Sequence, residues 1–205
     1  MESIIKTALK NSLTYSAYRD LVKRLSEQNA TTGLEQTDAH INFTKLNERR
    51  MKRWDKTLKV PEKAQKKIAE FNHKVTWLVI TESWCGDAAH VLPPLNKVAE
   101  INDNITLKVV LRDENRALMN LFLTNGSSSV PKLIVIENET NAVLNTYGPR
   151  PTEAASFVNR YKAKYGSLTP EFKEDLQHWY NNDKGQNVIK DVVELLLEFQ
   201  PNAYQ

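Results

Sequence analysis

Hydrophobic residues recur every three or four positions in the first and last parts of the chain, whereas the middle contains short apolar runs. The three- and four-residue spacing is the period of an amphipathic α-helix. The apolar runs are rich in β-branched residues and do not alternate with polar ones, which is typical of strands buried on both faces. The pattern predicts helices over residues 14–28, 42–58, 61–71, 86–101, 115–122, 152–164, 170–180 and 188–199, and strands over residues 75–81, 105–111, 133–136 and 142–147.

The order of the central elements predicts one α/β domain with a mixed sheet. Strands and helices alternate over residues 62–165, and a turn at residues 138–141 alone separates the last two strands, which predicts an antiparallel hairpin. A central four-stranded sheet would then be flanked by helices on both faces. Residues 1–61 and 166–205 are expected to be helical extensions that pack on this domain, because their helices have apolar faces to bury.

The composition is that of a folded globular protein. Of the 205 residues, 40% are hydrophobic and 26% are charged, which excludes a disordered tail and a collagen-like fibre. The net charge of +3 is too small to indicate a polyanionic partner by itself. No stretch approaches the roughly 18 apolar residues of a membrane-spanning helix, and the N-terminus lacks the apolar core of a secretory signal. We therefore expect a cytoplasmic location and no membrane partner.

The single cysteine lies at the junction of a predicted strand and a predicted helix. Cys85 follows the strand at residues 75–81, and the next helix begins there. Unpaired N–H groups and the positive end of the helix dipole stabilise a thiolate at such a position. Asp87 opposes a second negative charge on Cys85, so the sequence leaves the direction of the net pKa shift open. One cysteine excludes an intramolecular disulfide and a multi-cysteine metal site.

Four motifs resemble the thioredoxin family. Trp84-Cys85-Gly86 after a buried strand is similar to the start of the family's active site, and Pro93 lies where the active-site helix has its kinking proline. Val130-Pro131 falls where the family has a cis-proline loop that faces the active site, and Tyr147-Gly148 matches the glycine before the last helix. The resemblance covers roughly residues 62–165. It implies a thioredoxin-like fold in which the proline loop offers backbone groups to an extended substrate.

A narrower resemblance includes the terminal extensions. The segments at residues 46–56 (LNERRMKRWDK), 82–90 (ESWCGDAAH), 147–151 (YGPRP) and 176–185 (LQHWYNNDKG) are together similar to a bacterial group of thioredoxin-like proteins. This group has N- and C-terminal helical additions and the single-cysteine motif WCGDA. The resemblance covers almost the whole chain and implies the fold rather than a particular activity.

Two departures from the family pattern change the expected chemistry. The second cysteine of the family would lie three residues after the first, where this chain has Ala88, so a dithiol–disulfide cycle within one chain is impossible. The buried acid of the family, six residues before the first cysteine, is replaced by Val79. The chain is therefore not expected to be a conventional thioredoxin.

Two functions are left open by these residues. In the first, the Cys85 thiolate attacks a mixed disulfide or reacts with peroxide, and an external thiol resolves the product. The partner would be a protein or a low-molecular-weight thiol or disulfide, and no cofactor is expected. In the second, the thioredoxin groove binds an extended peptide or protein without turnover, and Trp84 forms an apolar wall for it. The candidate site consists of Cys85, the loop residues Glu82, Trp84, Gly86, Asp87 and Ala88, and the substrate-loop residues Val130 and Pro131.

A histidine and a basic segment add two further hypotheses. His90 lies three residues after Asp87, so on a helix the two side chains share a face and can pair. Its role is either a proton donor near the thiol or, as we favour, a partly exposed helix histidine. No His, Cys and acidic residues have ligand spacing, so no metal site is expected. Residues 45–67 contain ten Lys or Arg against three acids, and a third, weaker hypothesis is that this stripe meets phosphates or an acidic protein. Because the stripe lacks a set of interleaved base-stacking aromatic residues, we do not expect nucleic-acid binding.

Overall fold

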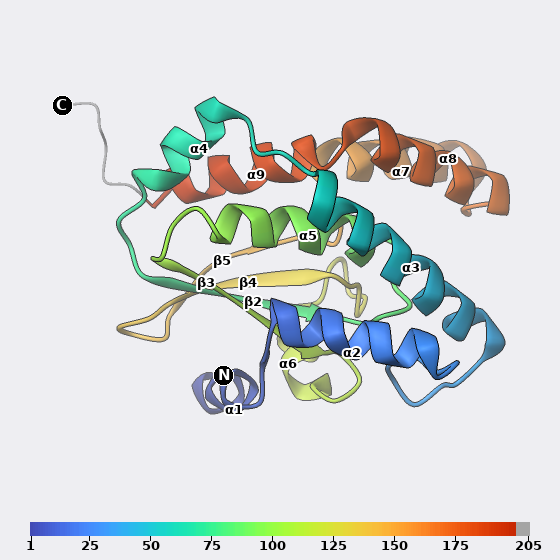
Figure 1. The fold of residues 1–205 in the computed structure, drawn as a ribbon, viewed down its shortest axis with the longest axis horizontal. Coiled ribbons are helices and arrows are strands. Elements are labelled where there is room, and N and C mark those ends of the chain that lie inside the picture. The colour runs from blue at the N-terminus through green and yellow to red at the C-terminus, as the bar shows by residue number, and fades with distance from the viewer. Residues whose placement is uncertain (200–205) are drawn as a thin grey trace.

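The computed structural model describes residues 1–199 and contains a mixed five-stranded sheet between helices (Figure 1). The strand order is β1-β3-β2-β4-β5. The elements in chain order are α1 (Glu2–Lys10), β1 (Leu13–Thr14), α2 (Tyr15–Glu27), α3 (Asp38–Thr57), α4 (Glu62–Ala69), β2 (Val75–Thr81), α5 (Ala88–Ala99), β3 (Ile105–Leu111), α6 (Arg116–Leu121), β4 (Lys132–Glu137), β5 (Val143–Tyr147), α7 (Thr152–Tyr165), α8 (Pro170–Asp183) and α9 (Gln186–Leu197).

Strand β2 is the centre of the sheet and carries the candidate site at its carboxyl end. It pairs in parallel with β3, with Val75 opposite Ile105 and Thr81 opposite Leu111. On its other side it pairs antiparallel with β4, which in turn forms the antiparallel hairpin with β5. Because ladders on both sides fix the register of β2, the chain leaves the sheet at Thr81 in a defined direction.

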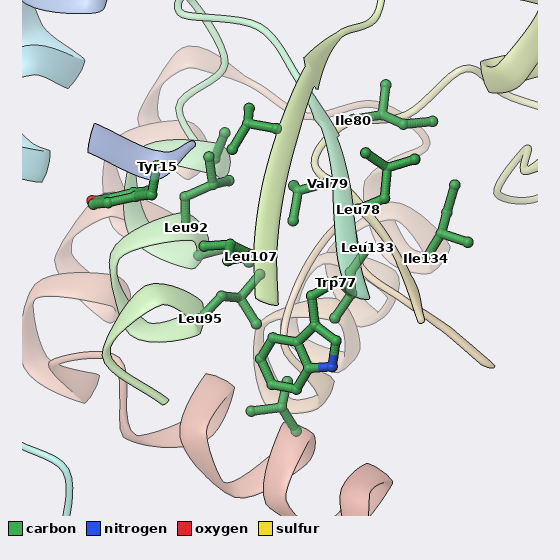
Figure 2. Close-up of a cluster of buried hydrophobic side chains, with 14 of the residues drawn as sticks. Tyr15, Trp77, Leu78, Val79, Ile80, Leu92, Leu95, Leu107, Leu133 and Ile134 are labelled. Carbon is green, nitrogen blue, oxygen red and sulfur yellow. The ribbon is translucent and has the colours of Figure 1, made fainter. Parts of the chain in front are cut away.

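The packing of the core explains why polar and apolar residues do not alternate along β2. Leu78 and Ile80 point to one face of the sheet and lie near Ile134, whereas Val79 points to the opposite face, toward Leu92 of α5 (Figure 2). All five side chains are completely buried. Each fully buried aliphatic side chain contributes about 1.5–3 kcal/mol through the hydrophobic effect. Both faces of β2 therefore need apolar residues, as the sequence predicted.

Helices cover the two faces unequally. Helix α5 packs on β3 and contacts α3 and α9, and in Figure 1 α4 and α9 lie above α5 whereas α1 and α6 lie below the sheet. Helix α9 contributes to the main core, whereas α7 and α8 pack on each other around a smaller cluster. That cluster consists of Ala154, Val158, Phe172, Leu176 and Tyr180. The C-terminal extension is thus anchored at two places.

The predicted α/β class and mixed sheet are confirmed, with two differences. Residues Leu13 and Thr14 add a short edge strand through antiparallel pairing with β3, so the sheet has one strand more than expected. Helix α1 lies in a segment for which no element was predicted. The domain boundaries at residues 61/62 and 165/166 stay predictions. Among residues 1–199, no helix combines the length and the apolar character needed to cross a membrane.

Candidate functional site

The cysteine lies in a tight turn between β2 and α5, as the sequence predicted. The backbone N–H of Cys85 donates to the Glu82 carbonyl at 3.2 Å, and the N–H of Ala89 donates to the Cys85 carbonyl at 3.3 Å. These hydrogen bonds join the turn to the first turn of α5. Cys85 is therefore fixed at the N-terminal end of this helix, beneath the loop that precedes β4.

The Cys85 thiol is buried and bonded. The residue is 8% exposed, and Sγ donates to the Val130 carbonyl at 3.2 Å. Burial raises the pKa of the thiol to about 12, and the negative charge of Asp87 acts in the same direction. Hydrogen bonds from the backbone N–H groups of Asp87 and Ala88, and the charge of Arg150, only partly oppose this increase. The sequence left open whether the pKa of Cys85 is raised or lowered, and in the structure it is raised.

The loop before β4 is held against the site by a close backbone contact. The Val130–Pro131 peptide bond is cis, and Pro131 is buried. Gly148 has a φ of +100°, and a Cβ atom on it would lie 2.5 Å from the Pro131 carbonyl oxygen. Only glycine fits this position, because it combines a left-handed backbone with a contact too close for any side chain. This contact sets the position of the segment that carries Arg150.

Asp87 is held by two partners that the sequence analysis did not identify. Its carboxylate forms a 2.7 Å ion pair with Arg150 and accepts a 2.9 Å hydrogen bond from the Tyr180 hydroxyl. Burial raises the pKa of Asp87, and both partners oppose the increase. Arg150 follows β5 and Tyr180 lies in α8, so the C-terminal extension contributes directly to the site. Both residues lie within the four segments that resemble the bacterial group. That resemblance was the only feature of the sequence that pointed to them.

His90 is buried, and the prediction of a partly exposed histidine is wrong. It is 2% exposed and stacks on Tyr180 at a centroid distance of 4.5 Å. Trp54 Nε1 donates to Nδ1 at 3.0 Å, so in the neutral ring Nε2 carries the proton and donates to Gln177 Oε1 at 3.0 Å. Burial and two nearby arginines lower the pKa of His90 to about 3. The pairing with Asp87 that a shared helix face would allow is not formed, because both side chains have other partners.

Hydroxyl groups from the N-terminal extension hold Ser83, in the loop between β2 and α5 that also carries Cys85. Ser83 Oγ lies 2.8 Å from Thr44 Oγ1 and 3.1 Å from Thr31 Oγ1, and it accepts the Thr32 N–H at 3.0 Å. Asn47 Nδ2 donates to the Ser83 carbonyl at 2.9 Å. These groups are buried and cannot hydrogen-bond to solvent. Each hydrogen bond within the cluster therefore replaces one that the group makes with water in the unfolded chain. The extension is therefore part of the support of the site.

Glu82 and Trp84 differ in their exposure. Glu82 is completely buried, and Oε1 accepts the backbone N–H of Asp113 at 2.9 Å, so this residue does not border the open face of the loop. Trp84 is partly exposed, stacks on His40 at 4.7 Å, and lies 4.9 Å beneath the Arg112 guanidinium carbon. An open cavity of about 390 Å³ borders Trp84, His40 and Arg112. Trp84 forms one wall of it.

Comparison with known proteins identifies the family. The family model described as thioredoxin matches residues 33–164, which is more than half of the chain. The chain belongs to the thioredoxin family. No curated protein matches this thioredoxin-family chain. The resemblance found in the sequence is confirmed at this level, and membership of the single-cysteine bacterial group stays a prediction.

Two solved structures show the same fold. A protein of unknown function from Pseudomonas aeruginosa has a TM-score of 0.58 and 17% identity, over 91% of this chain and 98% of that one. An HIV epitope-scaffold has a TM-score of 0.56 and 16% identity, over 92% of this chain and 100% of that one. At such low identity these likenesses extend to the fold alone.

The chemistry available to this thioredoxin-family site is limited by its residues. Ala88 lies where a second cysteine would complete a dithiol pair, and it is buried in the first turn of α5. A thiol–disulfide cycle within one chain is therefore impossible. In residues 1–199, no group of three or more His, Cys, Asp or Glu side chains is arranged to hold a metal ion.

Proposed function

We propose that this protein is a thioredoxin-fold binding module that holds an extended peptide in the groove beside Trp84 and does not turn it over. The observation that carries the proposal is the state of Cys85. Burial raises the pKa of the Cys85 thiol to about 12, so the neutral thiol and not the thiolate is favoured at neutral pH. The thiol proton is also engaged with the Val130 carbonyl. A site built for thiol exchange would need the opposite arrangement.

The shape of the surface supports a peptide rather than a small disulfide. A second cavity of about 420 Å³ shares Arg112, Asp113 and Arg116 with the cavity beside Trp84 and extends to Ser128. Together the two cavities connect the active-site loop with the loop that precedes β4. Ser128 and Arg116 are both exposed; an extended segment could lie along the loop at Ser128, and Arg116 favours an acidic side chain in the partner.

The rate of Cys85 alkylation as a function of pH tests the redox part of the proposal. We expect no modification of the folded protein by iodoacetamide below about pH 9, and rapid modification in denaturant, followed by intact mass. An inflection below about pH 7 would overturn the proposal. Because the chain has one cysteine, each modified molecule reports on this residue alone.

Selection from a random peptide library tests the binding part. We expect peptides selected on the wild-type protein to bind Cys85→Ser with unchanged affinity and to lose affinity for Trp84→Ala. The exposed Tyr165→Ala serves as a matched aromatic control because Tyr165 lies in α7 and is 56% exposed. Loss of binding in Cys85→Ser, or equal loss in both aromatic variants, would contradict a non-covalent groove.

Monothiol exchange is the second candidate, and the position of Cys85 before α5 favours it. The N–H groups of Asp87 and Ala88 and the charge of Arg150 each lower the pKa of the thiol. In that reaction the thiolate would attack a mixed disulfide, forming one S–S bond as the other breaks and a thiolate leaves. An external thiol would then release Cys85 by the same exchange. The alkylation experiment separates the two candidates.

A further inference from the structure

A cavity of about 450 Å³ lies between the end of α3 and the turn from α8 to α9. Figure 1 shows the last turn of α3 beneath this junction. Three cations line the cavity, namely Arg53, Lys59 and Lys184, while Trp54 and Leu58 provide apolar surface. No acidic residue is among those that line it. The cavity therefore combines concentrated positive charge with a partly apolar wall.

These cations have no counter-charge of their own in the described part of the chain. Within residues 1–199, no carboxylate lies at ion-pair distance from Arg53, Lys59 or Lys184. Arg53 is nevertheless held in place, because Nη2 donates to Asn181 Oδ1 at 2.6 Å and its guanidinium carbon lies 4.4 Å over the Trp54 ring. A positioned guanidinium without a carboxylate partner is suited to an anion from outside.

The turn that closes the cavity is fixed by packing. Gly185 has a φ of +75°, and a Cβ atom on it would lie 2.7 Å from Pro94 Cγ and 2.8 Å from Leu58 Cδ1. Gln186 Nε2 donates to the carbonyls of Lys59 and Lys184, each at 3.2 Å. These contacts tie the backbones of Lys59 and Lys184 to one side chain at the border of the cavity. The backbones that carry Lys59 and Lys184 are thus tied together, and the side chain of Arg53 is held by Asn181 and Trp54.

A neighbouring cavity borders the same glutamine, Gln186. It has a volume of about 220 Å³, and its lining is mixed, with Pro61, Ala64, Ile189 and Val193 on the apolar side and Lys63, Lys67 and Lys190 among the polar residues. One acid, Glu194, also borders it. A ligand that reaches both cavities would have an anionic group near Arg53 and an apolar or ring-bearing part that packs on Ala64, Ile189 and Val193.

We propose that the two cavities bind a small phosphate ester. Its phosphate would lie between Arg53, Lys59 and Lys184, and its organic part would pack against the apolar side of the neighbouring cavity. A phosphate monoester carries close to two negative charges at neutral pH and offers three acceptor oxygens, which matches three cations better than a carboxylate does. The concave apolar surface favours a small ester over a polyanion, which would need an extended surface. This proposal does not depend on the peptide groove beside Trp84.

Isothermal titration with a panel of phosphate esters tests the proposal. The probes are AMP, glucose 6-phosphate and hexyl phosphate, with inorganic phosphate and adenosine as the two separated parts. We expect at least one ester to bind more tightly than inorganic phosphate, and adenosine not to bind. Arg53→Gln and Lys184→Gln should each weaken ester binding by about tenfold or more. Lys10→Gln, on the exposed end of α1, should leave it unchanged.

Several outcomes would overturn the proposal. These are no binding of any ester at millimolar concentration, equal weakening by Lys10→Gln, or binding of inorganic phosphate as tight as that of every ester. Tighter binding of a heparin fragment that is insensitive to Arg53→Gln would indicate a diffuse basic surface instead. Urea unfolding of each variant shows that the fold is retained, and the two independent cation variants keep the test decisive if one of them is destabilised.

Discussion

Acidification should destabilise the protein through His90, and the size of the effect follows from its burial. The folded environment lowers the pKa of His90 from 6.5 to about 3. Between these values the unfolded chain binds a proton at this residue and the folded protein does not. Since stability rises with pH wherever the unfolded state binds more protons, stability is complete above about pH 6.5 and is lost as the pH falls toward 3.

The magnitude at moderate pH can be worked out from the two pKa values. At about pH 5 the unfolded histidine is almost fully protonated, and linkage gives a loss of about 2 kcal/mol relative to about pH 7.5. The neutral ring is kept by the Trp54 N–H, which donates to Nδ1 and would have to turn away from a protonated ring. A loss of this size is a large fraction of the stability of a typical domain.

Urea unfolding of wild-type protein and His90→Gln at both pH values measures this contribution. His90→Gln lowers stability at either pH because the stacked ring is lost. We expect the difference between wild type and variant to shrink by about 2 kcal/mol from about pH 7.5 to about pH 5. His178→Gln is the matched control, because that side chain is 67% exposed and should leave the pH dependence unchanged. A wild-type-to-His90→Gln difference that is the same at both pH values would refute the reasoning, since His90 would then be protonated in the folded protein.

Two further substitutions test the supports of the site. Gly148→Ala should destabilise the protein by about 2–4 kcal/mol in urea unfolding, because its Cβ would lie 2.5 Å from the Pro131 carbonyl oxygen. Gly126→Ala, which has a similar positive φ but no atom within 4 Å of its Cβ, should cost clearly less, and equal losses would contradict the steric argument. Ser83→Ala should cost about 1–3 kcal/mol because it removes the acceptor of the buried Thr32 N–H and one hydrogen-bond partner of the Thr31 and Thr44 hydroxyls. The exposed Ser127→Ala should change stability by less than about 0.5 kcal/mol, and a Ser83→Ala loss that small would show that the hydroxyl cluster contributes little.

The central strands were predictable from the sequence because strands buried on both faces consist of short runs of apolar residues. Strands β2 and β3 have the predicted bounds, since a strand buried on both faces has no room for polar positions. Helix α1 was also within reach, because Ile4, Ile5, Ala8 and Leu9 have helical spacing. Strand β1 was not, because its two residues are a strand only through pairing with β3.

The sequence predicted where the candidate site lies in the fold. It did not predict which side chains surround Cys85 and His90. The motif around Cys85 placed the cysteine at the start of α5, which is a local property. The burial of His90 depends on Trp54 and Gln177, which lie 36 and 87 residues away along the chain. The pKa of Cys85 likewise depends on how closely the loop before β4 covers it. Such contacts between distant segments leave no periodic pattern in the sequence.

The hydrogen bond between Tyr180 and Asp87 also has a consequence for the order of events on the ribosome. The two residues are 93 positions apart, and at a synthesis rate of about 5–20 residues per second Tyr180 is added roughly 5–20 s after Asp87. The hydroxyl cluster around Ser83 is available much earlier, because its threonines precede it in the chain. During synthesis the N-terminal partners of the loop around Cys85 are therefore available first, Arg150 follows, and the Tyr180 hydroxyl that bonds Asp87 comes last.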